Sequence, residues 1–525
     1  MNRRLDYGLI WNRVLAIVEE QAQVLMRTAF STVVREAGDL SAGVFDTRGR
    51  MIAQAVTGTP GHVNSMAEAV AHFLEAHPVA SLSPGDVLVT NDPWLATGHL
   101  NDFTVVTPVF RGDACVALFA STSHIADVGG RGFGADATEV YEEGLNIPIG
   151  YLFRGGQVDE TLMRIVRANV RDPVAAEGDL YSLTACNFAG SRAVLDLYED
   201  FEGLDLDDVG EHIISTSRKA VQDELAALPT GTWRYEMTID GYDEPLTLHC
   251  ATTLTGEAVH IDFSGSAPAS PFGINVPMAY TRAYATFAVR CMVGNDVPNN
   301  AGSLSTVIVH APEGCVLNAA RPKAVSARHS VGQMLPDLVL GCLAQALPEA
   351  VPAEGASCIW NPVFLGDGFV INPIYNGGTG ARAGIDGLST TAFPSGVRTT
   401  STEVNELTSA LVIWRREFRS GSGGAGRYRG GLGQTIEIGH REGQSFQVSK
   451  MFDRVANPAR GRAGGGDGAP GKVMLKSGAT LLAKGKETVP PGEILVLETP
   501  GGGGLGGAEL RDAEARKRDE RGGYV

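Results

Sequence analysis

The sequence predicts an α+β fold, a multi-lobed mixed fold built on antiparallel sheets. One observation is the helical spacing of apolar residues in several segments, first between Asp6 and Phe30, which is the pattern of amphipathic helices. The other is a series of short β-branched runs separated by glycine turns, which is typical of antiparallel strands. Because the chain has 525 residues, its length alone predicts two or three domains.

The composition argues against a nucleic-acid-binding protein and against a membrane-spanning one. The 60 acidic and 43 basic residues leave a net charge of −17, whereas non-specific nucleic-acid binding needs a basic surface. No apolar run reaches the ~18 residues of a membrane helix. The N-terminus lacks a continuous apolar core, so we expect a helix there and not a signal peptide. The seven cysteines are scattered and never in Cys-x-x-Cys spacing, which favours a reducing cytoplasm over disulfides or a thiolate zinc site.

Changes in sequence character divide the chain into three expected lobes. Residues 1–228 form an N-terminal α+β lobe that carries the histidine motifs described below. Residues 229–350 form a middle α+β lobe, and residues 351–525 form a glycine-rich lobe of loops and strands with a charged tail.

The N-terminal lobe is expected to begin with the helix at 6–30 and to continue into a β-hairpin. Strands at 42–45 and 51–53 flank a turn. Two carboxylates, Glu36 and Asp39, lie just before the first strand. A cap or turn role for Asp39 is as good an interpretation as a functional one.

A second helix is expected to follow this hairpin. Ser65 and Glu68 have the spacing of a capping box and predict that the helix starts there. His62 would then lie just before the helix, where it could face a site.

The next segment combines a hairpin with a repeated motif. Two β-branched runs, 103–110 and 115–120, are split by Arg-Gly-Asp and predict two antiparallel strands. His-x-x-Asp occurs at both outer ends of this hairpin. One such motif is weak evidence, because a single histidine is more often a surface or core residue.

The predicted hairpin places the two His-x-x-Asp motifs close together. A hairpin brings its outer ends together, so we expect His99 and Asp102 to lie near His124 and Asp127. Two imidazoles and one or two carboxylates suit a divalent transition metal such as zinc, manganese or iron.

The remaining segments add helices, a sheet and many glycine turns. An irregular loop after Gly130 carries Glu142 and Glu143, for which solvated loop charges are the default interpretation. An antiparallel sheet is expected between residues 232 and 266, with a further strand at 305–310. Further helices are expected at 161–170, 173–189, 209–228, 279–293 and 332–347.

The chain shows no nucleotide-binding motif in its expected context. Gly421, Gly423 and Gly426 match Gly-x-Gly-x-x-Gly, but no strand-then-helix pattern surrounds them. A Gly-Lys-Ser/Thr phosphate loop does not occur. The glycines at 421, 423 and 426 are expected to form tight turns between short strands.

Taken together, these blocks resemble the hydantoinase B/oxoprolinase family. This family comprises the B-type subunits of ATP-dependent N-methylhydantoinases and oxoprolinases and related subunits of acetone and acetophenone carboxylases. The similarity runs from the first helix to about Gly507. It is carried by REAGDLSAGVFDTRGRMIAQ, GDVLVTNDPWLATGHLNDFTVVTPVF, TSHIADVGG, EEGLNIPIG, DFSGSAP, PFGINVP, SGGAGRYRGGLG and LETPGGGGLG.

The resemblance implies a set of site residues. The metal ligands would be Glu36, His99, Asp102 and His124, in a hydantoinase B-like fold. Asp39 and Asp127 would support these ligands or bind a second metal. Apart from the resemblance, the chemistry suggests a base or substrate-orienting role for Asp127 or for a glutamate of the 139–143 loop, Glu142 or Glu143.

Two segments depart from the family pattern. Ala96-Thr97-Gly98-His99 replaces a Gly-Gly-Thr-His run and keeps the histidine. The run AVSARHSVGQMLPD is also different, and His329 is unusual there, which leaves the substrate and the role of His329 open.

The resemblance also implies a partner and an activity. The partner would be an A-type subunit with an actin-like ATP-binding fold, which phosphorylates the substrate's amide or carbonyl oxygen in a hetero-oligomer. The chain would be the metal-binding catalytic subunit of an ATP-dependent hydrolase that opens a hydantoin, N-methylhydantoin, 5-oxoproline or lactam ring. The alternatives are a subunit of a ketone carboxylase and a scaffold subunit with a structural metal.

Overall fold

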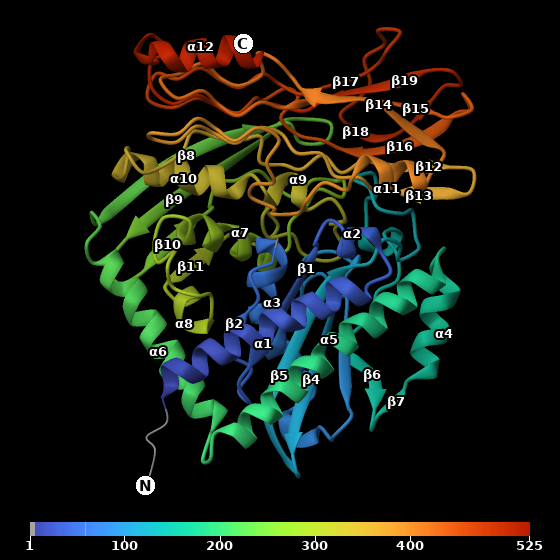
Figure 1. Ribbon diagram of the computed structural model, residues 1–525, viewed down its shortest axis with the longest axis vertical. Coiled ribbons are helices and arrows are strands. Elements are labelled where there is room, and N and C mark those ends of the chain that lie inside the picture. Colours follow the sequence, from blue (N-terminus) through green and yellow to red (C-terminus); the bar gives the residue numbers. More distant parts are fainter. Residues whose placement is uncertain (1–5, 58) are drawn as a thin grey trace.

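The structure, a computed structural model, describes residues 6–57 and 59–525. It contains one large antiparallel sheet and three smaller sheets, with helices packed against them (Figure 1). The predicted mixed α+β class with several antiparallel sheets is confirmed. The boundaries of the three lobes stay a prediction.

The largest sheet has seven strands in the order β2-β1-β5-β4-β3-β6-β7, each pair antiparallel. Its strands are buried on both faces: Val87 and Val89 point into one apolar core and Leu88 into another. The strands are β1 (Leu40–Phe45), β2 (Met51–Gln54), β3 (Val87–Thr90), β4 (Asp102–Arg111), β5 (Ala114–His124), β6 (Gly150–Arg154) and β7 (Gln157–Val158).

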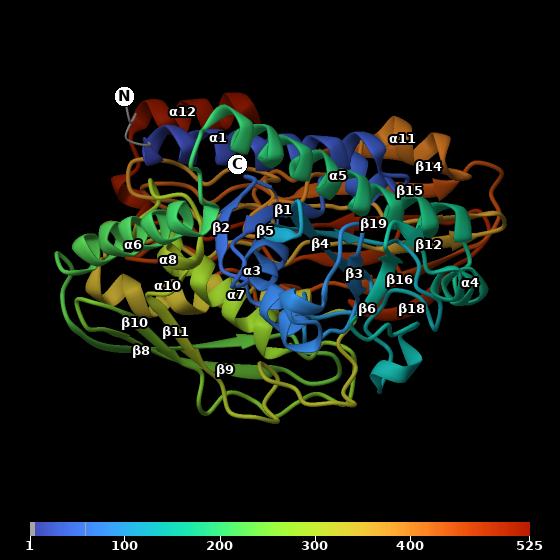
Figure 2. The ribbon, with the colours of Figure 1, turned by 90° about the horizontal axis from the view of Figure 1, so that it is seen from below.

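Helices cover both faces of this sheet. The long helices α1 and α5 lie side by side and share one core with it (Figure 2), whereas α3 packs on the opposite face. The helices of this part are α1 (Tyr7–Thr28), α2 (Thr32–Arg35), α3 (Pro60–Ala76), α4 (Glu160–Asn169), α5 (Pro173–Asp200) and α6 (Leu206–Leu225), with 3-10 turns at Val79–Ser81 and Val140–Glu142.

A second unit follows in the chain. Its four-stranded sheet has the order β11-β10-β9-β8, and α10 packs against β8 and β9. Helix α7 joins this unit to the first one by packing against α3. The elements are β8 (Gly231–Ile239), β9 (Leu246–Leu254), β10 (Val259–Asp262), α7 (Met278–Arg290), α8 (Ala301–Leu304), β11 (Val307–His310), α9 (His329–Gly332) and α10 (Leu335–Ala346).

The last third of the chain forms a layer of strands and loops across the other two units (Figure 1). Two four-stranded sheets, β13-β12-β16-β18 and β14-β15-β19-β17, enclose one apolar core. The elements are β12 (Val363–Gly366), β13 (Phe369–Ile371), α11 (Thr402–Leu407), β14 (Leu411–Phe418), β15 (Gln434–His440), β16 (Phe446–Met451), β17 (Lys472–Leu475), β18 (Lys484–Val489), β19 (Ile494–Glu498), a 3-10 turn at Ala508–Leu510 and α12 (Ala513–Gly522).

Glycine-rich segments of this layer pack backbone against backbone. Gly424 donates its N–H to the carbonyl of Gly502, and Gly502 donates to Gly431, both at 2.9 Å. A Cβ atom on Gly502 would overlap the carbonyl of Thr379, so only glycine fits there. The Gly-x-Gly-x-x-Gly match at Gly421 lies between strands β14 and β15, with no helix following it, so the match has a structural explanation.

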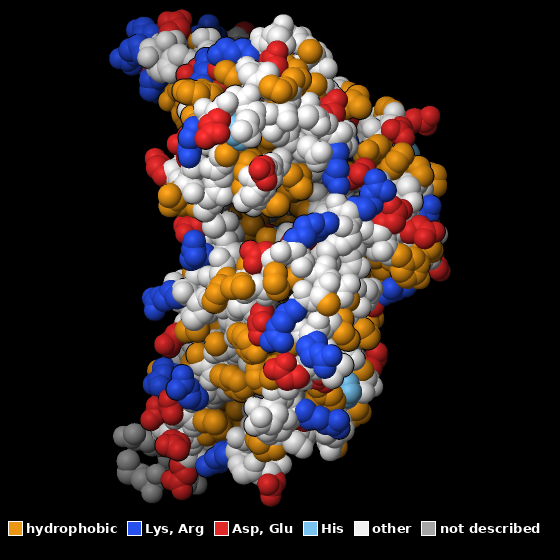
Figure 3. Space-filling view, turned by 90° about the vertical axis from the view of Figure 1, so that its right-hand side faces the viewer, with side chains coloured by type: hydrophobic (Ala, Val, Ile, Leu, Met, Phe, Trp, Pro, Cys, Tyr) orange, Lys and Arg blue, Asp and Glu red, His pale blue; other side chains and the backbone are white. Residues whose placement is uncertain are grey.

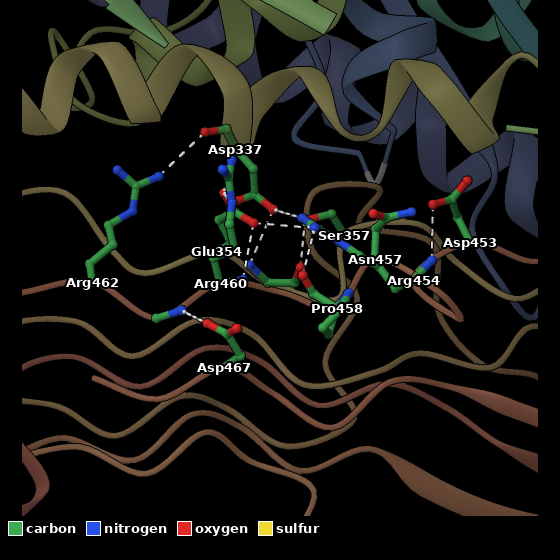
Figure 4. Close-up of polar contacts among 12 residues, drawn as sticks. Asp337, Glu354, Ser357, Asp453, Arg454, Asn457, Pro458, Arg460, Arg462 and Asp467 are labelled. Atoms are coloured by element: carbon green, nitrogen blue, oxygen red, sulfur yellow. Dashed lines mark hydrogen bonds and ion pairs between the residues drawn. The ribbon is translucent and has the colours of Figure 1, made fainter. Parts of the chain in front are cut away.

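Buried ion pairs fasten this layer to helix α10 (Figure 4). The Arg454 side chain is 1% exposed and lies 3.0 Å from Asp337 of α10 and 3.2 Å from Glu354. Arg460 also contacts Glu354, at 2.7 Å. Because charges removed from water are stabilised only by close partners, this network fixes where the layer docks.

Helix α3 starts earlier than the sequence predicts. Its first residue is Pro60, not a position near Ser65, because proline is well suited to the first turn of a helix. Ser65 Oγ donates back to the carbonyl of Gly61 within the helix. His62 therefore belongs to the first turn of α3.

The surface mixes apolar and charged groups. On the face shown in Figure 3, acidic and basic side chains are interspersed among hydrophobic patches. Among the described residues, no helix combines the length and the apolar character needed to cross a membrane.

Candidate metal centre

The predicted hairpin is confirmed, and its register brings the motifs together. Strands β4 and β5 pair so that Asp102 lies directly opposite His124. His99 comes from the loop before β4, where Gly98 has φ +93. His99, Asp102 and His124 are buried, and each offers a ligand atom within 4.8 Å of the other two.

Each of the two imidazoles has one buried nitrogen without a hydrogen-bond partner among the described residues. His99 Nδ1 lies 3.0 Å from the carbonyl of Ser326, so Nδ1 carries the proton and Nε2 keeps its lone pair. His99 Nε2 is 2.7 Å from Asp102 Oδ1, yet it makes no hydrogen bond with any described residue, and neither does His124 Nε2.

This geometry fits a bound metal ion. His99 Nε2 and Asp102 Oδ1 lie close together without a hydrogen bond, as two ligands of one ion do, and His124 Nδ1 lies 3.1 Å from the same Oδ1. The backbone carbonyl of Ser326 provides the outer hydrogen bond that ligating histidines usually make. Burial, together with the neighbouring Arg328, lowers the pKa of His99 to about 4, so the imidazole is neutral, as a ligand must be.

Asp102 is the most highly connected residue of the centre. Its Oδ2 accepts hydrogen bonds from Thr97 Oγ1 at 2.8 Å and Arg328 Nη2 at 2.6 Å. Burial alone would raise its pKa, but His62, His99 and Arg328 hold the pKa well below the usual range. The buried side chain is therefore a carboxylate.

Helix α3 contributes a third histidine. His62 Nε2 lies 2.8 Å from Asp102 Oδ2, and its Nδ1 lies 3.4 Å from Asp39 Oδ1. Burial would lower the pKa of His62, but the two carboxylates outweigh this effect and raise it. The sequence hinted at His62 only through its position beside a helix start.

The structure separates the two carboxylates before β1. Asp39 Oδ1 accepts a hydrogen bond from Thr59 Oγ1 at 2.8 Å and faces the centre. Glu36 is 39% exposed, pairs with Arg35 at 3.0 Å and is not part of the donor group. The left-handed Gly38, with φ +71, turns the chain between them.

Two of the three carboxylates that we expected to be catalytic, Asp127 and Glu142, pair with arginines outside the histidine centre. Asp127 contacts Arg171 Nη1 at 2.6 Å and accepts from the Gly129 N–H. Glu142 contacts Arg131 at 2.7 Å. Because both serve as loop contacts, neither lines the cavity at the histidines.

The third, Glu143, is buried behind the site. Its Oε1 accepts hydrogen bonds from the N–H groups of Val325 and Ser326, both at 2.7 Å, while Oε2 has no partner among the described residues. Burial raises its pKa to about 8. Glu143 thus reaches His99 only through the peptide of Ser326.

A cavity of about 40 Å³ lies at the centre; we call it the histidine cavity. A water molecule requires roughly 10–15 Å³ of cavity, so an ion with a few waters fits, whereas an amide ring does not. The ring of Phe133 lies 5.6 Å from that of His99 and 5.3 Å from that of His124. The polar residues of the opposite wall are Arg328, His329, Gln333, Asn361 and Asn372.

Sequence reasoning missed Arg328 and left His329 open. Arg328 lies 226 residues from Asp102 along the chain, and no local pattern links them. His329 Nε2 lies 2.9 Å from Asn361 Oδ1, and its ring stacks on Phe133. The departure of this run from the family pattern was the only signal for His329.

The chain matches a known protein family over almost its whole length. The hydantoinase B/oxoprolinase family model matches residues 4–508. The chain belongs to the hydantoinase B/oxoprolinase family. The predicted resemblance is therefore confirmed.

Two relatives differ in how much of their length this chain covers. The chain is 30% identical to 5-oxoprolinase 1 of Arabidopsis thaliana over 94% of its own length and 41% of that protein. It is 26% identical to a putative B-type subunit of a D-/L-hydantoinase from Pseudomonas sp. strain NS671, covering 97% and 91% of the two chains. The chain thus spans about two-fifths of the 5-oxoprolinases it matches.

A solved structure has the same fold. The ATP-dependent caprolactamase from Pseudomonas jessenii superposes with a TM-score of 0.89 at 23% identity, over 100% of this chain and 95% of the other. At this identity the likeness establishes the fold alone.

Proposed function

We propose that this member of the hydantoinase B/oxoprolinase family is the metal-binding catalytic chain of an ATP-dependent cyclic-amide hydrolase. The observation that carries the proposal is the convergence of His99, Asp102 and His124, which each offer a ligand atom within 4.8 Å of the other two, while the Nε2 atoms of both imidazoles have no hydrogen-bond partner among the described residues. The names of the relatives supply the substrate class.

The metal ligands would be His99, Asp102 and His124. When bound, a divalent cation supplies Lewis-acid activation of water or of a carbonyl group. Zinc, manganese and iron all suit such a nitrogen and oxygen donor set.

The surrounding residues hold this donor set in place. Arg328 and Thr97 hold Asp102 Oδ2, so that Oδ1, which His99 Nε2 and His124 Nδ1 approach at 2.7 and 3.1 Å, would face the ion. The Ser326 carbonyl holds the His99 proton on Nδ1, and Phe133 shields both imidazoles from water.

We assign the proton-accepting role to Asp39. Its side chain is 15% exposed, it lines the histidine cavity, and His62 at 3.4 Å stabilises its charge. Asp127 and Glu142 do not line this cavity, and Glu143 is protonated near neutral pH because its pKa is about 8.

ATP chemistry is assigned to a partner. The γ-phosphoryl group of ATP would be transferred to the amide oxygen, which yields ADP and an O-phosphorylated substrate. Water then adds at the carbonyl carbon, and the C–N bond breaks as the nitrogen takes a proton, which leaves an acyl phosphate. A second water hydrolyses the acyl phosphate to the ring-opened acid and phosphate. Since this chain has no nucleotide motif, an A-type subunit in a hetero-oligomer, or a fused region in longer relatives, would bind the ATP.

The test begins with the chain purified together with its A-type partner. Hydantoin, N-methylhydantoin, 5-oxoproline and ε-caprolactam are each assayed for ATP-dependent ring opening, with the metal content measured in parallel. Hydrolysis that needs both chains and the metal is expected. Bicarbonate-dependent consumption of a ketone would assign a carboxylase instead.

Substitution of a ligand separates a catalytic metal from a structural one. We expect His99→Ala to weaken metal binding at least about 100-fold and to abolish turnover in a complex that still assembles. His72→Ala is the matched control, because His72 is 38% exposed on α3 and its polar contact among the described residues is with Glu75, at 3.4 Å. Full turnover by the assembled His99→Ala complex would contradict the proposal.

A further inference from the structure

We propose that the wall of the histidine cavity opposite the metal donors binds a phosphoryl group. This inference rests on the proposed function, because it names what holds the phosphate of the O-phosphorylated amide and of the acyl phosphate that follows it. Two parts of the fold build this wall. Arg328 comes just before α9, whereas Asn361 and Asn372 belong to the glycine-rich layer that lies across it (Figure 1).

The two asparagines lie on one face of a β-hairpin. The antiparallel pairing of β12 with β13 continues in the same register to a bridge between Trp360 and Tyr375. Asn361 therefore lies opposite Ile374 and diagonal to Asn372. Diagonal neighbours share a face of the strands and lie about 7–8 Å apart, and all three of these residues line the histidine cavity. A small anion placed between the two amides can contact both.

Arg328 faces the same cavity with one nitrogen unpaired. Its Nε donates to the carbonyl of Thr97 and its Nη2 to Asp102 Oδ2, both at 2.6 Å. The guanidinium also lies over the ring of Tyr280, 4.1 Å from its centroid. These contacts fix the side chain, yet Nη1 makes no hydrogen bond with a described residue and is not fully enclosed. Because Arg328 lines the cavity, a ligand there can accept from Nη1.

Both asparagine amides have an N–H group available as well. Asn361 is 7% exposed, and its Oδ1 lies 2.9 Å from His329 Nε2, so Nδ2 is without a partner among the described residues. Asn372 is half-buried, and its Nδ2 also has no described partner. Neither Nδ2 atom is fully enclosed, in contrast to Asn372 Oδ1. Phosphoryl oxygens are strong acceptors for such donors, and a buried donor without an acceptor costs free energy.

The charges around the cavity favour an anion once the metal site is filled. Asp39 is the one carboxylate among the described residues that line the cavity. Asp102 is already paired with Arg328, so these two charges offset each other. A divalent cation held by the histidines would be the largest local charge and would exceed that of Asp39.

The size of the cavity admits the phosphoryl group and leaves the ring at its mouth. A volume of about 40 Å³ corresponds to roughly three water molecules at about 10–15 Å³ each, so phosphoryl oxygens can take the places of waters. Asp39, with its side chain 15% exposed, and the half-buried Asn372 are the most accessible residues of the lining, and they mark the mouth. The substrate carbon that bears the phosphate oxygen would then lie near Asp39, to which we assign the proton-accepting role.

The experiment measures phosphate binding by the full-length chain loaded with zinc, without ATP or partner. Titrations followed by ³¹P NMR give the affinities for inorganic phosphate and acetyl phosphate, and inductively coupled plasma analysis gives the metal content. Asn361→Asp and Asn372→Asp each keep the shape of the side chain but replace its N–H donor by an acceptor oxygen. Asn12→Asp, exposed on α1 and outside the cavity, is the matched control, because it adds the same charge.

We expect inorganic phosphate and acetyl phosphate to bind the wild-type chain and to compete with each other. Asn361→Asp and Asn372→Asp should each weaken both affinities about tenfold or more and keep the metal, whereas Asn12→Asp should bind as wild type does. Arg328 is not substituted, because it also holds Asp102. Thermal unfolding shows that each variant is folded, and the half-buried Asn372 provides a test that does not disturb the contact with His329.

Three outcomes would overturn the inference. The first is a wild-type chain that does not bind acetyl phosphate. The second is unchanged affinity in both Asn361→Asp and Asn372→Asp, which would mean that the metal alone binds phosphate. The third is an equal loss in Asn12→Asp, which would be an effect of net charge.

Failure of this inference can be told apart from failure of the proposed function. ATP-dependent ring opening by the complete complex, with no phosphate binding at these asparagines, would leave the proposed function intact and refute the phosphoryl site. Phosphate binding that depends on both asparagines, in a chain whose complete complex opens no cyclic amide, would refute the proposed function and retain the site.

Discussion

At the scale of single residues, Glu143 is a buried carboxyl that acts on the site from behind. Its Oε1 accepts the N–H groups of Val325 and Ser326, and the carbonyl of Ser326 holds His99 Nδ1. The ligand orientation therefore depends on a residue that does not line the cavity. Gly98 has a comparable role on the other side, since it leaves room for Arg328.

The first prediction concerns the protonation of Glu143. Because its pKa is about 8 when folded and about 4.5 when unfolded, the folded chain binds more protons between these values, and the free energy of unfolding falls as pH rises through this window. Glu143→Gln removes the titration. We expect the melting temperature of the variant, relative to wild type, to rise from pH 5 to about pH 8.5. Parallel pH profiles for the two proteins would contradict this.

The second prediction concerns Gly98. A Cβ atom there would lie 2.7 Å from Arg328 Cδ, and φ is +93. Gly98→Ala should therefore cost more than about 1 kcal/mol of stability and weaken metal binding by displacing Arg328 from Asp102. Gly112→Ala is the control, because it also has positive φ but nothing within 4 Å of the added atom. Equal metal affinities in both variants would show that Arg328 tolerates the methyl group.

At the scale of elements, a hairpin and a helix build the site. The β4–β5 register sets Asp102 opposite His124, and a shift of one residue would turn these side chains to opposite faces of the sheet. Helix α3 then places His62 against Asp102. Its start at Pro60 matters, because a helix beginning near Ser65 would leave His62 in a loop.

The third prediction tests the contribution of α3. His62→Phe keeps an aromatic ring but removes the partner of Asp102 Oδ2 and Asp39. Removing such outer contacts weakens metal binding about 10- to 100-fold, which competition with a chelator measures. His72→Phe on the same helix should leave the affinity unchanged. An unaltered affinity in His62→Phe would make His62 a packing residue.

At the scale of the whole molecule, the site depends on the docking of three layers. The hairpin provides the donors, the segment around Arg328 closes the opposite wall, and the glycine-rich layer supplies Asn361 and Asn372. The Arg454 network fastens this layer to α10 (Figure 4).

The fourth prediction follows from this network. Arg454→Met leaves Asp337 buried without its cation and leaves Glu354 with Arg460 alone, and breaking such a buried pair costs about 3–5 kcal/mol in denaturant unfolding. Lys219→Met, which breaks an exposed pair with Asp223, should cost less than about 1 kcal/mol. Similar losses in both variants would mean that the buried network contributes no more than a surface pair.

Local patterns predicted much of this protein. Apolar spacing placed the long helices, β-branched runs placed the hairpin, and two His-x-x-Asp motifs pointed to His99, Asp102 and His124 as neighbours. These features depend on backbone geometry over a few residues, so the sequence itself determines them. The roles of Glu36 and Asp127 came from analogy and spacing, and local turns at Gly38 and Gly129 direct these carboxylates elsewhere.

Only the tertiary structure decided what surrounds the donors. Arg328 meets Asp102 across 226 residues, and Ser326 meets His99 across 227. No periodicity reports such contacts, because they arise when whole layers pack and bury charges that then require partners.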